Sequence, residues 1–217
     1  MSKKVTLFLF ISSLMLVLMS NIALSAEEAK EKVEKYQEAI TQVDNTDKLV
    51  LDIEISINTN IGQLADLLGK HGCAVPAITA TPGTAAYAQQ EQTRNDAVME
   101  MVDDPQTKED LKGKFSSNEL GILQTIYDTL FGEKNSLLTI EGGVSSLQDL
   151  LNKATSDLPT FVQQILTGDL KGLGLDDVQK VINDAANSLD KVVKLPGKIS
   201  KIIGIVEKIL SFISFFL

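Results

Sequence analysis

The stretch from Leu49 to Asn58, LVLDIEISIN, decides between a helical fold and one that contains a sheet. From Leu51 onward its apolar residues alternate with polar ones, and it is rich in β-branched side chains, which is typical of a half-buried strand. The same residues also continue a helical register that extends well beyond the stretch. In that register, apolar residues recur every seven positions at Tyr36, Val43, Val50, Ile57 and Leu64.

A sustained seven-residue period is typical of a long helix in a bundle. Ile53, Ile61 and Leu68 fall beside the same line and widen the apolar face. A strand, by contrast, would have no partner, because the chain contains no second convincing alternating run. We therefore predict one helix from about Ala26 to Leu68, and leave open an interruption at Asn45 to Asp47.

Glycine and proline divide the following part of the chain into shorter predicted elements. The stretch 69–83 holds three Gly and two Pro and is a connection, after which we expect a helix over 84–102. Asp104 and Pro105 are a good N-cap and first helical position for a short helix toward Lys112.

Ser116 and Glu119 form a capping box that opens a helix, which we expect to stop at Gly132. Beyond Gly132 the predicted pieces are an apolar segment at 136–140 and helices at 145–154, 159–166 and 175–193. Leu195-Pro196-Gly197 is expected to separate the last of these helices from a terminal one.

These elements predict an all-α protein, a helical bundle with a long N-terminal helix and an amphipathic C-terminal helix. We divide the chain into a signal peptide at 1–26, an acidic helical bundle domain at 27–193 and an amphipathic apolar C-terminal helix at 194–217.

The first residues have the composition of a secretory signal peptide. Lys3 and Lys4 precede an apolar run from Val5 to Met19, and small residues near Ser25 and Ala26 offer a cleavage site. The alternative is an uncleaved membrane anchor, but the apolar run is shorter than the ~20 residues that span a bilayer. We therefore expect a secreted or periplasmic protein that could associate with a membrane.

The charge of the chain is unevenly distributed. The net charge is −9, and becomes −11 once Lys3 and Lys4 leave with the signal peptide. Nucleic acid is therefore not an expected partner, because phosphate binding needs a basic surface. From Asp190 onward the net charge is instead +3, so only this part suits an anionic surface.

The inventory of reactive side chains is poor. One His and one Cys cannot form a multi-His or multi-Cys zinc site. His71 and Cys73 lie two residues apart and could form a thiol–imidazole pair, but a polar loop His beside a small buried residue is the simpler interpretation. The paired acidic residues lack the spacing of a calcium loop. We expect no enzyme activity, catalytic residue, cofactor or metal.

The terminal segment 198–217, KISKIIGIVEKILSFISFFL, has a broad apolar face and a polar or small stripe opposite it. The bundle, a membrane or a partner protein must cover that face. Lys194, Lys201 and Lys208 also recur every seven residues along one side, which suits anionic headgroups. The expected membrane or partner contacts are Lys194, Lys198, Lys201, Ile202, Ile205, Val206, Lys208, Ile209, Phe212, Ile213 and Phe216.

The sequence thus predicts a non-enzymatic helical protein that interacts with anionic membranes through its C-terminal helix and that could perturb them or form pores. The alternative is a periplasmic or extracellular interaction or structural protein. In that case the C-terminal helix packs in its own core, docks a partner protein or mediates oligomerisation.

Overall fold

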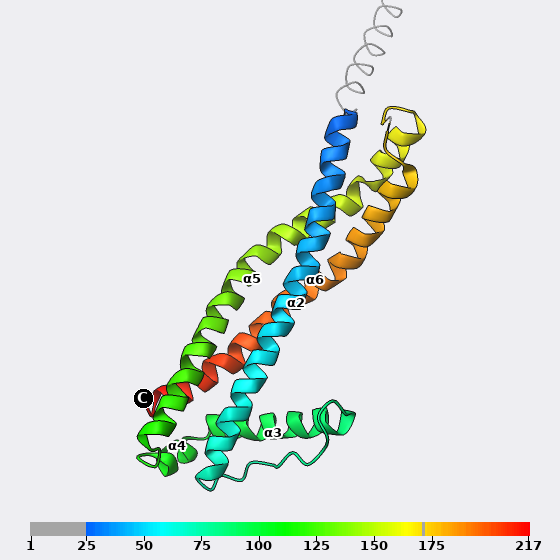
Figure 1. The fold of residues 1–217 in the computed structure, drawn as a ribbon. Coiled ribbons are helices and arrows are strands. Elements are labelled where there is room, and N and C mark those ends of the chain that lie inside the picture. Colours follow the sequence, from blue (N-terminus) through cyan, green and yellow to red (C-terminus); the bar gives the residue numbers. More distant parts are fainter. Residues whose placement is uncertain (1–24, 171) are drawn as a thin grey trace, which may run out of the picture. The chain divides into compact units, whose positions relative to one another are not determined.

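The structure, a computed structural model, describes residues 25–170 and 172–217. Within them every regular element is a helix, which confirms the predicted all-α fold (Figure 1). The signal peptide predicted at 1–26 lies outside the described residues except for its last two. The helices are α2 (Ala26–Lys70), α3 (Ala85–Asp103), α4 (Pro105–Leu111), α5 (Ser117–Leu166) and α6 (Leu175–Ser214).

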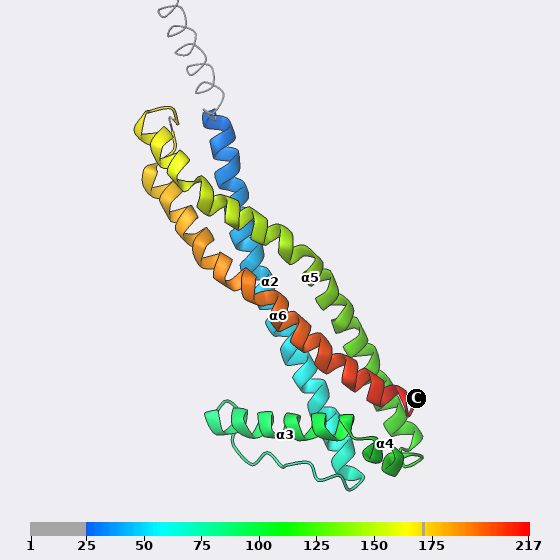
Figure 2. The same cartoon turned by 180° about the vertical axis from the view of Figure 1, so that it is seen from behind.

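The chain forms two compact units, and the three long helices α2, α5 and α6 contribute a segment to each. Figure 2 shows these helices from behind. Within the described residues, unit 1 comprises 25–44 together with 146–170 and 172–192. Unit 2 comprises 45–145 and 193–217, and therefore contains α3, α4 and the end of α6.

The ambiguous stretch 49–58 is helical, because α2 is one helix of 45 residues without an interruption. The alternating residues of that stretch do not share one environment. Ile53 and Ile57 are buried, whereas Leu51 and Ile55 are about half exposed, at 48% and 56%. A strand would have placed all four on one face, so the seven-residue period was the correct guide.

The predicted helix stop at Gly132 and the short pieces after it are wrong, because α5 is one helix of 50 residues with Pro159 inside it. An interior Gly costs about 1 kcal/mol relative to Ala, while each fully buried Leu or Val contributes ~1.5–3 kcal/mol. A row of fully or almost fully buried residues, seven apart, runs through the supposed breaks: Leu123, Leu130, Leu137, Val144 and Leu151.

The predicted break at Leu195-Pro196-Gly197 is also wrong, because α6 is one helix of 40 residues that continues through it. An interior Pro costs about 3 kcal/mol or more, and burial again outweighs it. A row of residues with no exposed surface, seven apart, runs along α6: Val178, Ala185, Val192, Ile199, Val206 and Ile213. The predicted domain boundary between 193 and 194 lies inside this helix.

The predicted capping residues act as the sequence indicated. The Asp104 carboxylate accepts hydrogen bonds from the backbone N–H groups of Gln106 and Thr107, at 3.1 and 3.0 Å. The Ser116 backbone N–H donates to Glu119 Oε2 at 2.9 Å, and the Glu119 N–H donates to Ser116 Oγ at 3.4 Å. These contacts fix the starts of α4 and α5.

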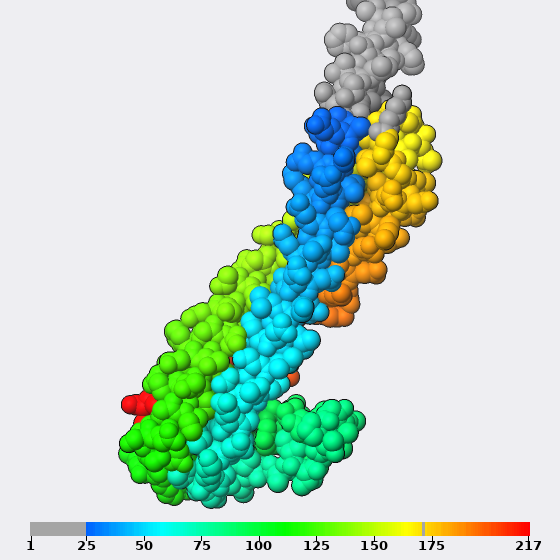
Figure 3. Space-filling view, viewed as in Figure 1, coloured from blue at the N-terminus to red at the C-terminus, as the bar shows by residue number. Residues whose placement is uncertain are grey.

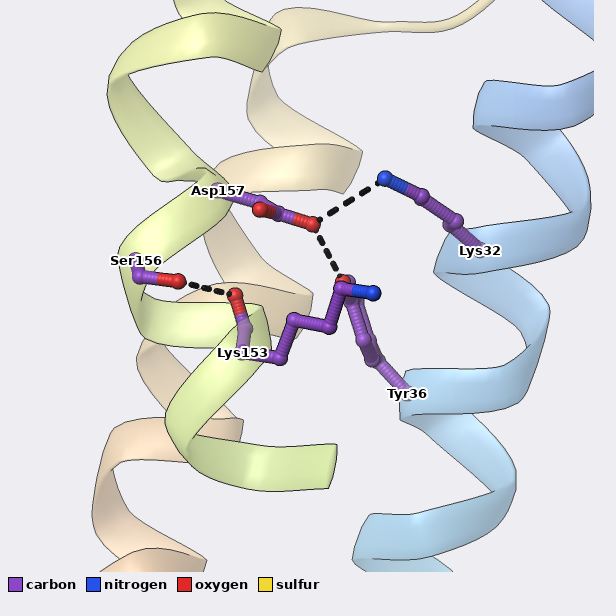
Figure 4. Close-up of polar contacts among 5 residues, drawn as sticks. All are labelled: Lys32, Tyr36, Lys153, Ser156 and Asp157. Atoms are coloured by element: carbon purple, nitrogen blue, oxygen red, sulfur yellow. Dashed lines mark hydrogen bonds and ion pairs between the residues drawn. The ribbon is translucent and has the colours of Figure 1, made fainter. Parts of the chain in front are cut away.

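A polar contact ties α2 to α5 within unit 1 (Figure 4). The Tyr36 hydroxyl donates to Asp157 Oδ2 at 2.6 Å, and Lys32 Nζ lies 3.3 Å from the same oxygen. Tyr36 is only 2% exposed. Burial raises the pKa of its phenol well above the ordinary value, and the hydrogen bond and negative charge of Asp157 raise it further.

The raised pKa of the Tyr36 phenol leads to a prediction about stability at alkaline pH. Since the phenol pKa is higher in the folded than in the unfolded protein, the folded state holds more protons above about pH 10. This contribution to stability is complete below about pH 10 and is lost as the pH rises toward the folded pKa. We expect Tyr36→Phe to cost about 1.5 kcal/mol at neutral pH and to make the alkaline loss shallower, as measured by urea unfolding from neutral to alkaline pH. Tyr127→Phe is the control, because the Tyr127 hydroxyl makes no hydrogen bond among the described residues. The prediction is contradicted if the free energy of unfolding falls equally steeply with alkaline pH in the wild type and in Tyr36→Phe.

The continuity of α5 predicts that Gly142→Ala is stabilising. A Cβ added at Gly142 meets no atom within 4 Å, so the variant should gain about 0.5–1 kcal/mol through lower unfolded-state entropy. Thermal unfolding followed by circular dichroism should show a rise of about 2–4 °C per kcal/mol. Gly113→Ala should be destabilising, because Gly113 has a φ of +70°. A lower melting temperature for Gly142→Ala would mean that α5 breaks there.

Candidate functional site

The end of α6, where the predicted contact residues lie, is packed inside unit 2. Its apolar face is covered by the unit itself. The predicted contacts that are buried are Ile202, Val206, Ile209, Phe212 and Ile213. Those of intermediate exposure are Lys198, Ile205 and Phe216, and the exposed ones are Lys194, Lys201 and Lys208. Membrane or partner contact through the buried set stays a prediction, and it now requires this segment to leave the core.

Ion pairs link the polar side of the same segment to three other helices. Lys198 Nζ lies 3.0 Å from Glu54 Oε2 of α2, and Glu207 Oε1 lies 2.7 Å from Lys134 Nζ of α5. Lys208 pairs with Asp103, the last residue of α3. Each of these partly exposed pairs contributes ~0–1 kcal/mol, so apolar burial holds the segment in place.

An aromatic cluster surrounds the last residues of the chain. Phe216 makes edge-to-face contacts with Phe115, Phe212 and Phe215, with ring centroids 5.0 to 5.1 Å apart. The ring of His71 packs against Phe115 at 4.9 Å. These pairs each contribute ~0.5–1.5 kcal/mol beyond simple burial, and they hold Phe216 against Phe115 and Phe212.

The last residues form an apolar surface that we call the C-terminal tip, made of Phe215, Phe216 and Leu217. Phe215 is 42% exposed and Leu217 is 52% exposed. Figure 3 shows part of this segment, in red, at the surface beside the beginning of α5. Lys112, the C-cap of α4, lies next to the tip, and Lys108 of α4 lies next to Phe212, the buried ring that precedes it. Lys112 Nζ is 5.6 Å from the ring centre of Phe215, and Lys108 Nζ is 6.0 Å from that of Phe212.

Sequence reasoning did not identify Phe215, Leu217, Lys108 or Lys112 as site residues. Helical periodicity does not place Phe215 and Leu217, because α6 ends at Ser214. The lysines are far earlier in the chain, and no local pattern connects them with the tip. The concentration of Phe in the last few residues was the available signal.

The arrangement around Cys73 is unsuited to nucleophilic chemistry. Burial raises the pKa of the thiol, and the nearby Lys114 and Asp110 have smaller, opposing effects. His71 Nε2 lies 3.3 Å from Glu119 Oε1, and no hydrogen bond joins the imidazole to the thiol among the described residues. Within residues 25–170 and 172–217 no three His, Cys, Asp or Glu side chains gather in a way that could hold a metal ion.

None of the helices in the described part of the chain combines the length and the apolarity needed to cross a bilayer. Comparison with known proteins adds no assignment, since no family model, curated protein or solved structure matches the chain.

The contrast between two neighbouring phenylalanines predicts different effects on stability. Phe212 has no exposed surface, so Phe212→Ala should cost about 3–5 kcal/mol. Phe215→Ala should cost less, about 1 kcal/mol, because nearly half of that side chain is already exposed. Urea unfolding of the two variants measures both values. Similar losses for the two would show that the tip is part of the core.

Proposed function

We propose that this is a secreted, non-enzymatic helical protein that binds anionic membrane surfaces through its C-terminal tip. The observation that carries the proposal is the exposed apolar pair Phe215 and Leu217, with Lys112 over the Phe215 ring and Lys108 over the neighbouring buried ring of Phe212. Aromatic and aliphatic side chains beside lysines are typical of segments that lie in the membrane interface. The signal-peptide pattern at the N-terminus supports export.

The magnitudes favour weak and reversible binding. Full burial of a Phe or Leu side chain contributes ~1.5–3 kcal/mol, and the two exposed tip residues are each about half covered already. Each lysine near an anionic surface adds about 1 kcal/mol, which salt screens. Lys112 also pairs with Glu109 at 3.7 Å, so its contribution is at the lower end. The total of about 2–5 kcal/mol is below the roughly 5.5 kcal/mol of a single myristoyl anchor.

The same geometry limits how much of α6 takes part. Ile202, Val206 and Ile209 are buried in unit 2 and would enter a membrane only if the helix end left its packing. Moving these side chains from the core to a bilayer exchanges one apolar environment for another. The main barrier to insertion is therefore the temporary exposure of the apolar face of α6 to water. Surface binding by the tip is therefore the first step, and insertion or membrane perturbation is a later one.

Flotation of the mature protein with liposomes tests the proposal. We expect the protein to float with vesicles containing phosphatidylglycerol and not with pure phosphatidylcholine vesicles, and we expect rising salt to weaken the binding. The double variant Phe215→Ser, Leu217→Ser should bind at least about tenfold more weakly, which corresponds to the loss of about 1.4 kcal/mol.

The matched control is Leu49→Ser in α2, which changes an equally exposed leucine elsewhere in unit 2. This variant should float like the wild type. The proposal fails if wild-type protein ignores anionic vesicles at low salt, or if the tip variant binds as well as the control.

A further inference from the structure

A cleft in unit 2 is independent of the C-terminal tip and lies between α2, α3 and α6. It has a volume of about 270 Å³, which is near the lower end of the range of about 300–1,000 Å³ found for small-molecule pockets. Its apolar lining comes from all three helices and consists of Ile57, Ile61, Met99, Ile202 and Ile205.

One buried amide in the cleft has an unused hydrogen-bonding end. Asn95 of α3 lines the cleft and is only 7% exposed. Its Nδ2 donates to Asn58 Oδ1 at 3.2 Å, whereas its Oδ1 has no partner among the described residues. If the oxygen and nitrogen of the Asn95 amide exchanged places, the nitrogen would be the atom without a partner. Buried polar atoms are nearly always paired in native proteins, with protein groups or with bound molecules, so a hydrogen-bond donor is expected beside this acceptor.

The charged residues around the cleft differ in whether they have partners. Glu54 and Lys198 pair with each other at 3.0 Å. Asp96 accepts a hydrogen bond from the side chain of Gln92 at 2.7 Å. Lys201 also lines the cleft, is exposed, and forms no ion pair with any residue that the structure describes. The lining therefore holds one cation without an ion-pair partner, Lys201, and one carboxylate without a cation, Asp96, among the residues that the structure describes.

We propose that this cleft binds a small amphipathic carboxylate that also carries a hydroxyl group, such as a hydroxylated medium-chain fatty acid. The hydroxyl donates to Asn95 Oδ1, the hydrocarbon chain lies on the isoleucine and methionine lining, and the carboxylate lies at Lys201. A hydroxyl can both donate and accept, so it satisfies the Asn95 amide in either orientation. The carboxylate stays at the wet rim, where its desolvation cost is small.

Three matched probes separate these contributions: 10-hydroxydecanoate, decanoate without the hydroxyl, and 1,10-decanediol without the carboxylate. Titration calorimetry of the mature chain should show 10-hydroxydecanoate binding at least about tenfold more tightly than either of the others. Isoleucine methyl NMR should place the shifts at Ile57, Ile61, Ile202 and Ile205.

Variants assign the two polar contacts. Asn95→Leu should remove the preference for 10-hydroxydecanoate over decanoate and still leave decanoate bound. Lys201→Gln should remove the preference for the acid over the diol. Lys48→Gln, which changes an exposed lysine of α2 that does not line the cleft, should alter neither preference.

Circular dichroism melting checks that the variants fold. If Asn95→Leu does not fold, Lys201→Gln alone tests the proposal. The proposal is overturned if the three probes bind equally, if neither variant changes the preferences, or if millimolar 10-hydroxydecanoate gives no heat and no methyl shifts. The last result would mean that the cleft holds water only. Because the C-terminal tip lines no part of the cleft, the tip double variant should bind 10-hydroxydecanoate normally, so failure of membrane binding and failure of this site are distinguishable.

Discussion

The structure depends on the burial of apolar side chains that recur every seven residues along α2, α5 and α6. In α6 the row from Val178 to Ile213 has no exposed member, and the row from Leu123 to Leu151 in α5 is at most 2% exposed. Each buried Val, Leu or Ile of these rows contributes ~1.5–3 kcal/mol, and that sum exceeds the cost of about 3 kcal/mol for Pro159 or Pro196. Helix length in this protein is therefore set by the continuity of the core row, and glycine or proline does not end a helix while the row continues.

Much of the fold was predictable from the sequence, and the errors have one physical cause. The row Tyr36 to Leu64 predicted α2 correctly against a plausible strand, and the caps at Asp104 and Ser116 were predicted because capping depends on neighbouring residues only. The same seven-residue period is present in α5 and α6, but the helix-breaking propensity of Gly132 and Pro196 points locally to an end of the helix at each of them. Local propensities are worth about 1–3 kcal/mol, so a long tertiary row overrides them.

The candidate site was predictable only in part, for a different reason. An amphipathic pattern shows that a face must be covered, but the pattern is the same whether protein or lipid covers it. Phe212 and Phe215 lie close together in an equally apolar segment, yet one is fully buried and the other is 42% exposed. Phe115 packs against Phe216 and Lys108 of α4 lies over Phe212, and no sequence period records these contacts between distant segments. The orphan acceptor of Asn95 likewise exists only because α2, α3 and α6 enclose it.

The spacing of Lys194, Lys201 and Lys208 in α6 shows that core packing alone can produce a lysine pattern like that expected of a membrane-binding helix. Each of its three lysines follows, by two positions, a residue that has no exposed surface: Val192, Ile199 and Val206. Any outward position of a helix with a seven-residue core period also recurs every seven residues, so the spacing is a consequence of the core and not separate support for headgroup binding.

The local surroundings decide what each lysine does. Lys208 pairs with Asp103, while Lys201 lines a cleft and forms no ion pair within the described part of the chain. The proposed membrane binding therefore rests on Lys112 and Lys108, whose nitrogen atoms lie next to the rings of Phe215 and Phe212.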